Sequence, residues 1–346
     1  MQDEQWRLGR QSNGMGACEK MKNENFPPST ANICPICGFG EHTTLYKNLK
    51  DCWLGSPGNW SLYTCKSCGL AYLYPPPTSE EIRRAYSKYF THQVPITTTG
   101  KTGNESLSSW LIPRLKKSYR WALRGVTQKR DEMHNMYISH LTPGRLLDVG
   151  CGNGMFLKRM RDLGWSVEGV DTDPQSAKAA DEAYGIAIHT GTLQNARFPE
   201  NHFDSITMSH VIEHVLDPLP ILAESRRILR PGGVLVIATP NVQSMGHHLF
   251  RRKWLGLDPP RHLCLFCRKS LELLVRRAGF MHPQTHTSAA RADMIFTDMM
   301  RVQTGRLDGT LRRGWHLYSQ VFLLLELSAI LWAPNAGEDL ILRTRK

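Results

Sequence analysis

Short apolar runs alternate with amphipathic segments in the second half of the chain, and this alternation predicts its central fold. The apolar runs have the length of buried strands and cover residues 146–149, 165–171, 186–189, 203–209 and 234–239. The segments between them repeat with helical periodicity, and residues 229–233 read as a turn. Strands that alternate with helices in this way predict an α/β fold with a doubly wound, mostly parallel sheet.

The polarity pattern divides the rest of the chain. Residues 1–32 are polar with scattered charges and lack an apolar core of signal-peptide length, so we expect a disordered leader. A small module over 33–77 follows and ends in a proline run. A helical linker or cap over 78–140 starts at Thr78-Ser79-Glu80-Glu81, where a capping residue precedes two acids. The α/β domain then covers 141–346, with a helical insertion at 291–333.

Within that insertion, residues 317–332 are almost continuously apolar. The run is short for a membrane span and carries Glu326 near its middle, so a core or lid helix is expected. The alternative is an interfacial helix that makes peripheral membrane contact and brings the protein to a lipid-linked substrate. Four upstream cations would assist it, namely Arg301, Arg306, Arg312 and Arg313.

Three glycines at alternate positions separate the first strand of the α/β domain from its first helix. They are Gly150, Gly152 and Gly154, and Asp148 precedes them. Glycine lets the backbone approach a ligand, and a helix N-terminus offers free N–H groups to it. A dinucleotide fingerprint has the spacing G-x-G-x-x-G, whereas these glycines have the spacing G-x-G-x-G, with Met155 in place of the third dinucleotide glycine. Asp171 ends the second strand, where a carboxylate can bind both hydroxyls of a ribose.

This glycine turn with its downstream Asp resembles the class I S-adenosylmethionine (SAM) dependent methyltransferases. Residues 209–218 resemble the E-H-V-x-D-P signature of small-molecule methyltransferases related to the ubiquinone-biosynthesis O-methyltransferase. Pro260-Arg261-His262-Leu263 with Phe266 matches a pattern of the same group. The resemblance covers roughly residues 144–280 and the last strand. It implies a Rossmann-like methyltransferase sheet whose final strand, near 338–343, is antiparallel.

The resemblance also implies which residues hold SAM. The three glycines would shape the loop around its methionine part, Asp171 would bind the ribose, and Asp148 would hold the loop and the amine. Many relatives carry an Asp where this chain has Thr192, which leaves an adenine contact through that side chain open. The full expected set is Asp148, Gly150, Gly152, Gly154, Asp171, Thr192, Leu193 and Ser209.

Methyl transfer to a hydroxyl needs alignment and a group that accepts the proton. Histidine suits that task near neutral pH. The candidates are His210, directly after the fourth strand, His214, one helical turn later, and His262. Each could instead be structural, and His214 could fix the loop by hydrogen bonding. Glu213 is expected to orient the loop rather than to react.

Two C-x-x-C-G knuckles in the N-terminal module predict a structural zinc site. Their ligands are Cys34, Cys37, Cys65 and Cys68. Four thiolates suit tetrahedral zinc and leave no open position for catalysis. The alternative is a pair of reduced surface dithiols. A further pair, Cys264 and Cys267, has no partner pair and is interpreted as two incidental thiols in a strand-like segment. An odd total of nine cysteines favours metal and free thiols, hence a reducing, cytoplasmic compartment.

The net charge of +12 suits anionic partners, or reflects only a basic surface. The cations are dispersed, and few accompany the aromatic residues between the knuckles, so nucleic acid is not expected as a partner. No N-P-P-Y, D-P-P-Y or Pro-Cys motif follows the fourth strand, which argues against methylation of base amino groups and of cytosine C5. The sequence does not predict an oligomeric state.

We therefore expect a SAM-dependent methyltransferase that acts on a small-molecule or sugar acceptor, at a hydroxyl. Three alternatives stay open: a C-methyltransferase for a nucleotide-linked sugar, an RNA-binding or RNA-modifying protein that uses the zinc module, and a non-catalytic SAM sensor.

Overall fold

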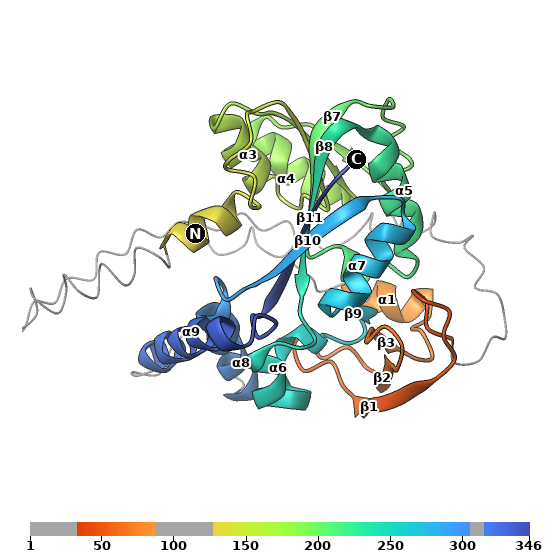
Figure 1. The fold of residues 1–346 in the computed structure, drawn as a ribbon, viewed down its shortest axis with the longest axis vertical. Helices are drawn as coiled ribbons and strands as arrows, with labels where there is room; N and C mark the ends of the chain where they lie inside the picture. Colours follow the sequence, from red (N-terminus) through yellow and green to blue (C-terminus); the bar gives the residue numbers. More distant parts are fainter. Residues whose placement is uncertain (1–32, 87–126, 305–314) are drawn as a thin grey trace, which may run out of the picture.

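The computed structural model describes residues 33–86, 127–304 and 315–346 (Figure 1). The expected leader at 1–32 lies outside them, as do most of the linker and three of the four cations upstream of 317–332. The described chain forms a seven-stranded sheet in the order β10-β11-β8-β7-β4-β5-β6 and a four-stranded sheet in the order β1-β2-β3-β9.

The strands of the large sheet are β4 (Arg145–Val149), β5 (Ser166–Asp171), β6 (Ile188–Thr190), β7 (Phe203–Ser209), β8 (Leu229–Pro240), β10 (Met281–Ser288) and β11 (Asp339–Arg345). The small sheet contains β1 (His42–Leu49), β2 (Trp60–Cys65), β3 (Ala71–Leu73) and β9 (Cys264–Leu265). The helices are α1 (Ser79–Tyr86), α3 (Met155–Asp162), α4 (Pro174–Tyr184), α5 (Pro218–Ile228), α6 (Met245–Phe250), α7 (Arg268–Arg277), α8 (Ala292–Thr304) and α9 (Trp315–Trp332). Short 3₁₀ turns cover η2 (Ile212–His214), η3 (Arg251–Lys253) and η4 (Leu255–Leu257).

The centre of the large sheet confirms the predicted α/β class. Strand β4 pairs in parallel with both β5 and β7, and β11 runs antiparallel to β8. Leu146, Leu147 and Ile206 are completely buried there. Helix α4 illustrates how local sequence sets an element: the Asp173 carboxylate accepts the Gln175 N–H at 2.9 Å, Pro174 opens the helix, and Gly185 ends it at φ 62°.

Three details of the sheet differ from the sequence-based expectation. Strand β10, which pairs with β11, was not predicted, because its sequence is largely polar and most of it is exposed at the sheet edge. Strand β6 begins two residues later than expected, at Ile188. The expected turn at 229–233 is part of β8, which absorbs it as a register shift against β7, with Gly232 at φ 77°.

The N-terminal sheet is completed by a strand that lies about 190 residues further along the chain. Strand β9 pairs with β3, so that Ala71 faces Leu265 and Tyr72 faces Cys264. Nearby, Nη1 and Nη2 of Arg261 each donate to one carboxylate oxygen of Asp51 at 2.9 Å, and both side chains are completely buried. The expected boundary after residue 77 therefore leaves out β9. Figure 1 shows this small sheet, with β9 next to β3, beside α7.

Helix α9 has one buried and one exposed apolar face. Phe322 stacks on Phe296 of α8. Glu326, on the same helix as Phe322, is completely buried. Burial, together with the nearby Glu338 carboxyl, raises the pKa of Glu326 to about 9. The side chain is thus protonated near neutral pH, which explains a carboxyl group in an apolar run. In the described ranges, no helix is long and apolar enough to cross a membrane.

Candidate active site

The glycine turn adopts backbone conformations that side chains rarely tolerate. Gly150, Gly152 and Gly154 have φ values of 71°, 51° and 74°. A Cβ atom on Gly150 would lie 2.5 Å from a methyl carbon of Val211, and one on Gly154 would lie 2.7 Å from the Cβ of Ala180. The turn therefore requires glycine both for its conformation and for its close contacts.

The Asp171 carboxylate connects the glycine turn to the start of α4. One oxygen accepts the Gly152 N–H at 2.8 Å, and the other accepts the Asp173 N–H at the same distance. Burial raises the pKa of Asp171, although these backbone donors oppose the shift. The carboxylate is thus held at the carboxyl end of β5, as a ribose-binding group must be, with lone pairs left to accept from hydroxyl groups.

Asp148 is a buried carboxyl group at the end of β4. The Thr207 hydroxyl donates to it at 2.6 Å, and burial raises its pKa to about 7. It lines a cavity of about 210 Å³ together with Ser209 and His210. Because burial and the neighbouring Asp171 charge disfavour the ionised form of Asp148, an ammonium group placed in the cavity would stabilise its charged form. The site therefore fits the amino group of SAM.

The two residues expected near adenine, Thr192 and Leu193, differ in burial. Thr192 is exposed, and its hydroxyl accepts the Asn195 N–H at 3.3 Å. Leu193 is 1% exposed and packs in the main core. Only the backbone of Leu193 can therefore face a bound nucleotide. The role of Thr192 and Leu193 toward SAM stays a prediction.

His210 follows β7 and lines the cavity. Its backbone is strained, with φ 53°. Its Nδ1 lies 3.1 Å from Oε1 of Glu213, and Nη1 of Arg291 contacts its Nε2. A guanidinium can only donate and a carboxylate can only accept, so this network assigns the proton to Nδ1 and a lone pair to Nε2. The imidazole is therefore oriented as a proton acceptor.

Glu213 orients His210 through the contact with Nδ1. It is completely buried, and its second oxygen accepts the Thr239 hydroxyl at 3.0 Å. Burial alone would raise its pKa, but the hydrogen bond from His210 and the neighbouring imidazoles lower it to about 2. The carboxylate stays ionised at neutral pH. Its contacts fit the loop-orienting role expected from the sequence.

His214 and His262 each contact a backbone carbonyl. Nδ1 of His214 is 3.0 Å from the Arg261 carbonyl, and Nδ1 of His262 is 2.8 Å from the Gly256 carbonyl. Burial, reinforced by His262, lowers the pKa of His214 to about 4. The Tyr86 hydroxyl also contacts Nδ1 of His214, at 2.9 Å. Neither histidine is among the residues that line the cavity.

The cavity also contains groups that sequence reasoning missed. Arg291 comes from the segment before α8, Asp339 begins β11, and Tyr137 precedes β4. The Tyr137 hydroxyl donates to Ser288 at 2.9 Å. These residues lie more than 70 positions from His210 and in no motif, so no local signal in the sequence points to them.

The four knuckle cysteines converge as expected for a metal site. Their sulfur atoms all lie within 4.8 Å of one another, with 3.6 Å between Cys34 and Cys68 and 3.5 Å between Cys37 and Cys65. Tetrahedral zinc with bonds of about 2.3 Å needs sulfur atoms about 3.8 Å apart. A hydrogen bond from Cys68 lowers the pKa of Cys34 to about 5, despite burial. The donor set therefore fits a zinc ion.

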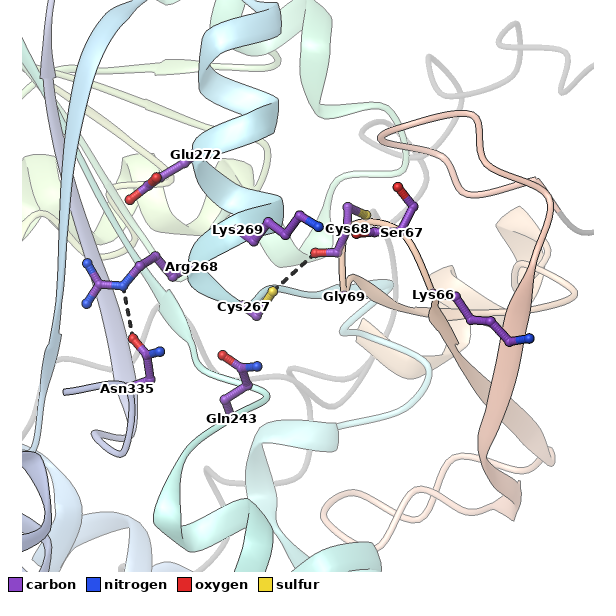
Figure 2. Close-up of a pocket in the computed structure, with 10 residues that line it drawn as sticks. All are labelled: Lys66, Ser67, Cys68, Gly69, Gln243, Cys267, Arg268, Lys269, Glu272 and Asn335. Carbon is purple, nitrogen blue, oxygen red and sulfur yellow. Dashed lines mark hydrogen bonds between the residues drawn. The ribbon is translucent and has the colours of Figure 1, made fainter. Parts of the chain in front are cut away.

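The second knuckle is attached to the start of α7. The Cys267 thiol donates to the Cys68 carbonyl at 3.3 Å (Figure 2). A Cβ on Gly69 would lie 2.9 Å from that sulfur, so glycine is required at the contact. Figure 2 shows Lys269 extending from α7 toward Ser67, whose carbonyl it binds. Cys267 thus has a packing role at this junction and lies outside the four-sulfur cluster.

Comparison with known proteins agrees with this geometry. Residues 124–282 match the model of a family described as a methyltransferase domain. The chain is 38% identical over 102 residues to the ubiquinone biosynthesis O-methyltransferase of Cereibacter sphaeroides, which covers 28% of this chain and 41% of that protein. It is 36% identical over 108 residues to the same-named protein of Parvibaculum lavamentivorans, covering 30% and 43%.

Among solved structures, a SAM-dependent methyltransferase from Archaeoglobus fulgidus is similar with a TM-score of 0.43 at 17% identity, over 66% of this chain and 99% of that one. The matches to the two ubiquinone biosynthesis O-methyltransferases span about two-fifths of the length of those relatives.

Proposed function

We propose that this chain, whose residues 124–282 match the model of a methyltransferase domain, transfers the methyl group of SAM to a hydroxyl of a small-molecule or glycan acceptor. The observation that carries the proposal is that Asp148, which suits an ammonium group, and His210, oriented as a proton acceptor, line one cavity. The cavity lies at the carboxyl ends of parallel strands, where ligands of such sheets bind.

SAM, when bound, supplies an electrophilic methyl group on a sulfonium. Gly150 and Gly152 shape the backbone beside its methionine part, Asp148 holds the amino group, and Asp171 accepts from the ribose hydroxyls. His210 receives the acceptor's hydroxyl proton at Nε2, and the buried Glu213 carboxylate stabilises the imidazolium through Nδ1. The names of the matched relatives, both ubiquinone biosynthesis O-methyltransferases, support oxygen as the methylated atom.

A product screen with methyl-labelled SAM tests this function. Purified protein is incubated with hydroxylated aromatic compounds, sugar nucleotides and lipid-linked glycans, and label in the product is located by mass spectrometry. We expect label on an oxygen of one class. Label on carbon would support the C-methyltransferase alternative instead, and label in RNA would contradict the proposal.

Replacing His210 with alanine should lower kcat by about 10²- to 10⁴-fold, the range of general-base catalysis. The affinity for SAM, measured by calorimetry, should change less than threefold, because Asp148 and Asp171 remain. His316, which is exposed on α9, provides the matched control as His316→Ala. An unchanged kcat in His210→Ala would exclude the imidazole as the base.

The exposed face of α9 supports a second element of the proposal, peripheral contact with an anionic membrane. Seven apolar side chains on this helix are 45–90% exposed: Leu317, Tyr318, Val321, Leu324, Leu325, Leu331 and Trp332. A helix that is apolar all round normally needs cover on both sides. The chain's charge of +12 suits anionic lipid and opposes self-association.

We expect the protein to sediment with vesicles that contain phosphatidylglycerol, and less with vesicles of phosphatidylcholine alone. Leu325→Ser combined with Trp332→Ser should reduce vesicle binding at least tenfold, since it removes two exposed apolar groups. Leu163→Ser, which alters an exposed leucine after α3, is the control. Equal sedimentation of all three proteins would contradict membrane contact through α9.

A further inference from the structure

Arg291 places a guanidinium in the candidate acceptor cavity. It belongs to the segment between β10 and α8, and it lines the cavity with His210, Asp339 and Tyr137. About one third of its side chain is exposed, at 32%. A cation in this position has consequences for what the cavity can bind.

Only some of the N–H donors of Arg291 have a hydrogen-bond partner among the described residues. Nη1 donates to Nε2 of His210. The Asp339 carboxylate forms an ion pair with Arg291, but its oxygen lies 3.9 Å from Nη1, beyond hydrogen-bond distance. Within the described part of the chain, Nε and Nη2 have no hydrogen-bond partner. Arg291 therefore has donors left for a ligand, and a guanidinium binds planar anions such as carboxylates with two parallel bonds.

The same contact occupies the atom that has to act as base. Nε2 of His210 carries the lone pair that would accept the hydroxyl proton, and Arg291 donates to that lone pair. Asp339 does not compete for the imidazole, because its carboxylate is 3.7 Å from Nε2. His210 can thus act only after the guanidinium has moved away from Nε2.

We propose that Arg291 binds an anionic group of the acceptor and that this interaction releases His210 for catalysis. The inference rests on the proposed function and deepens it, since it assigns the acceptor to the class of hydroxyl compounds that carry a carboxylate or phosphate. The acceptor's anion draws the guanidinium off Nε2. The hydroxyl proton then passes to Nε2, the oxygen–methyl bond forms as the sulfur–methyl bond breaks, and the sulfonium leaves as a neutral thioether. The imidazolium later returns its proton to water.

Arg291 lines the same cavity as His210, so an anion bound by the guanidinium lies in the same cavity as the base. A neutral acceptor would leave the guanidinium on His210, so the base would stay occupied. The carboxylate of SAM is a second source of the same chemistry, and the experiment must separate it from an anion on the acceptor.

Calorimetry with benzoate as the probe separates the two sources. The protein is first saturated with S-adenosylhomocysteine (SAH), which carries the same carboxylate as SAM, and benzoate is then titrated. We expect Arg291→Gln to weaken benzoate binding at least tenfold and to change the Kd for SAH less than twofold. Arg301→Gln, on α8 and outside the cavity lining, is the matched control.

Two results would overturn the inference. Equal benzoate binding by the parent and Arg291→Gln excludes the arginine as the anion site. A weaker affinity for SAH, with benzoate binding unchanged, assigns Arg291 to the cofactor carboxylate. If neither the parent nor any variant binds SAH, the proposed function itself fails, and this outcome is distinct from the other two.

A kinetic comparison uses two acceptors that differ in charge alone, 3,4-dihydroxybenzoate and its methyl ester. The parent should prefer the acid at least tenfold in kcat/KM, and Arg291→Gln should reduce that ratio to near one. Preference of the parent for the ester would contradict the proposal. The calorimetric result decides by itself if neither compound is methylated.

Discussion

Replacing Asp171 with alanine is expected to weaken SAM binding about 100-fold. The carboxylate holds the glycine turn through Gly152 and the start of α4 through Asp173, at 2.8 Å each. It is also the group proposed to accept both ribose hydroxyls. Two hydrogen bonds to a charged group contribute about 1.5 kcal/mol each, and about 3 kcal/mol corresponds to roughly 100-fold in Kd. Isothermal titration with SAH measures the loss.

The control for this variant is Asp181→Ala, which removes an exposed carboxyl from α4, the helix that Asp173 caps. Its Kd for SAH should equal that of the parent. Circular dichroism of Asp171→Ala should show an intact fold, because the strands around β5 keep their pairing. Parent-like affinity in well-folded Asp171→Ala would remove the basis of the proposed SAM site.

Replacing Cys34 and Cys37 together with serine is expected to abolish zinc binding and to lower Tm by more than 10 °C. Small metal sites supply folding free energy directly, because the unfolded chain rarely holds a preformed site and the ion therefore binds the folded form. The four sulfur atoms lie within 4.8 Å, an arrangement in which several thiolates without a cation would repel. Metal analysis and thermal unfolding of the full-length protein measure both effects.

This loss should extend from the knuckles to the active site. Strand β3 pairs with β9, the Leu73 N–H binds the Leu263 carbonyl at 3.0 Å, and the Leu263 N–H binds the Glu213 carbonyl at 2.8 Å. Methyl transfer should therefore fall with the zinc content although the cysteines are not catalytic.

Cys52→Ser, at an exposed cysteine outside the cluster, is the matched control. It should keep one equivalent of zinc, the parent Tm and the parent activity. A full equivalent of zinc in the double variant would contradict the site.

The elements that the sequence predicted well are those that depend on local chemistry. The glycine turn requires positive φ at three nearby positions, and only glycine supplies this cheaply, so spacing alone identified it. Asp173 and Gly185 define the ends of α4 for similar reasons. The knuckles carry their own turn and ligand pattern within five residues. Strand β10 was missed because an edge strand needs no apolar run.

The amino-acid sequence by itself determined the fold class, the predicted SAM turn and the four sulfur ligands, because each is specified by neighbours along the chain. Only the tertiary structure decided that β9 completes the N-terminal sheet, that His210 rather than His214 or His262 lines the cavity, and that Arg291 contacts it. These are contacts between residues far apart in the sequence. They depend on how the sheets and the insertion pack, and no local pattern of residues encodes that packing.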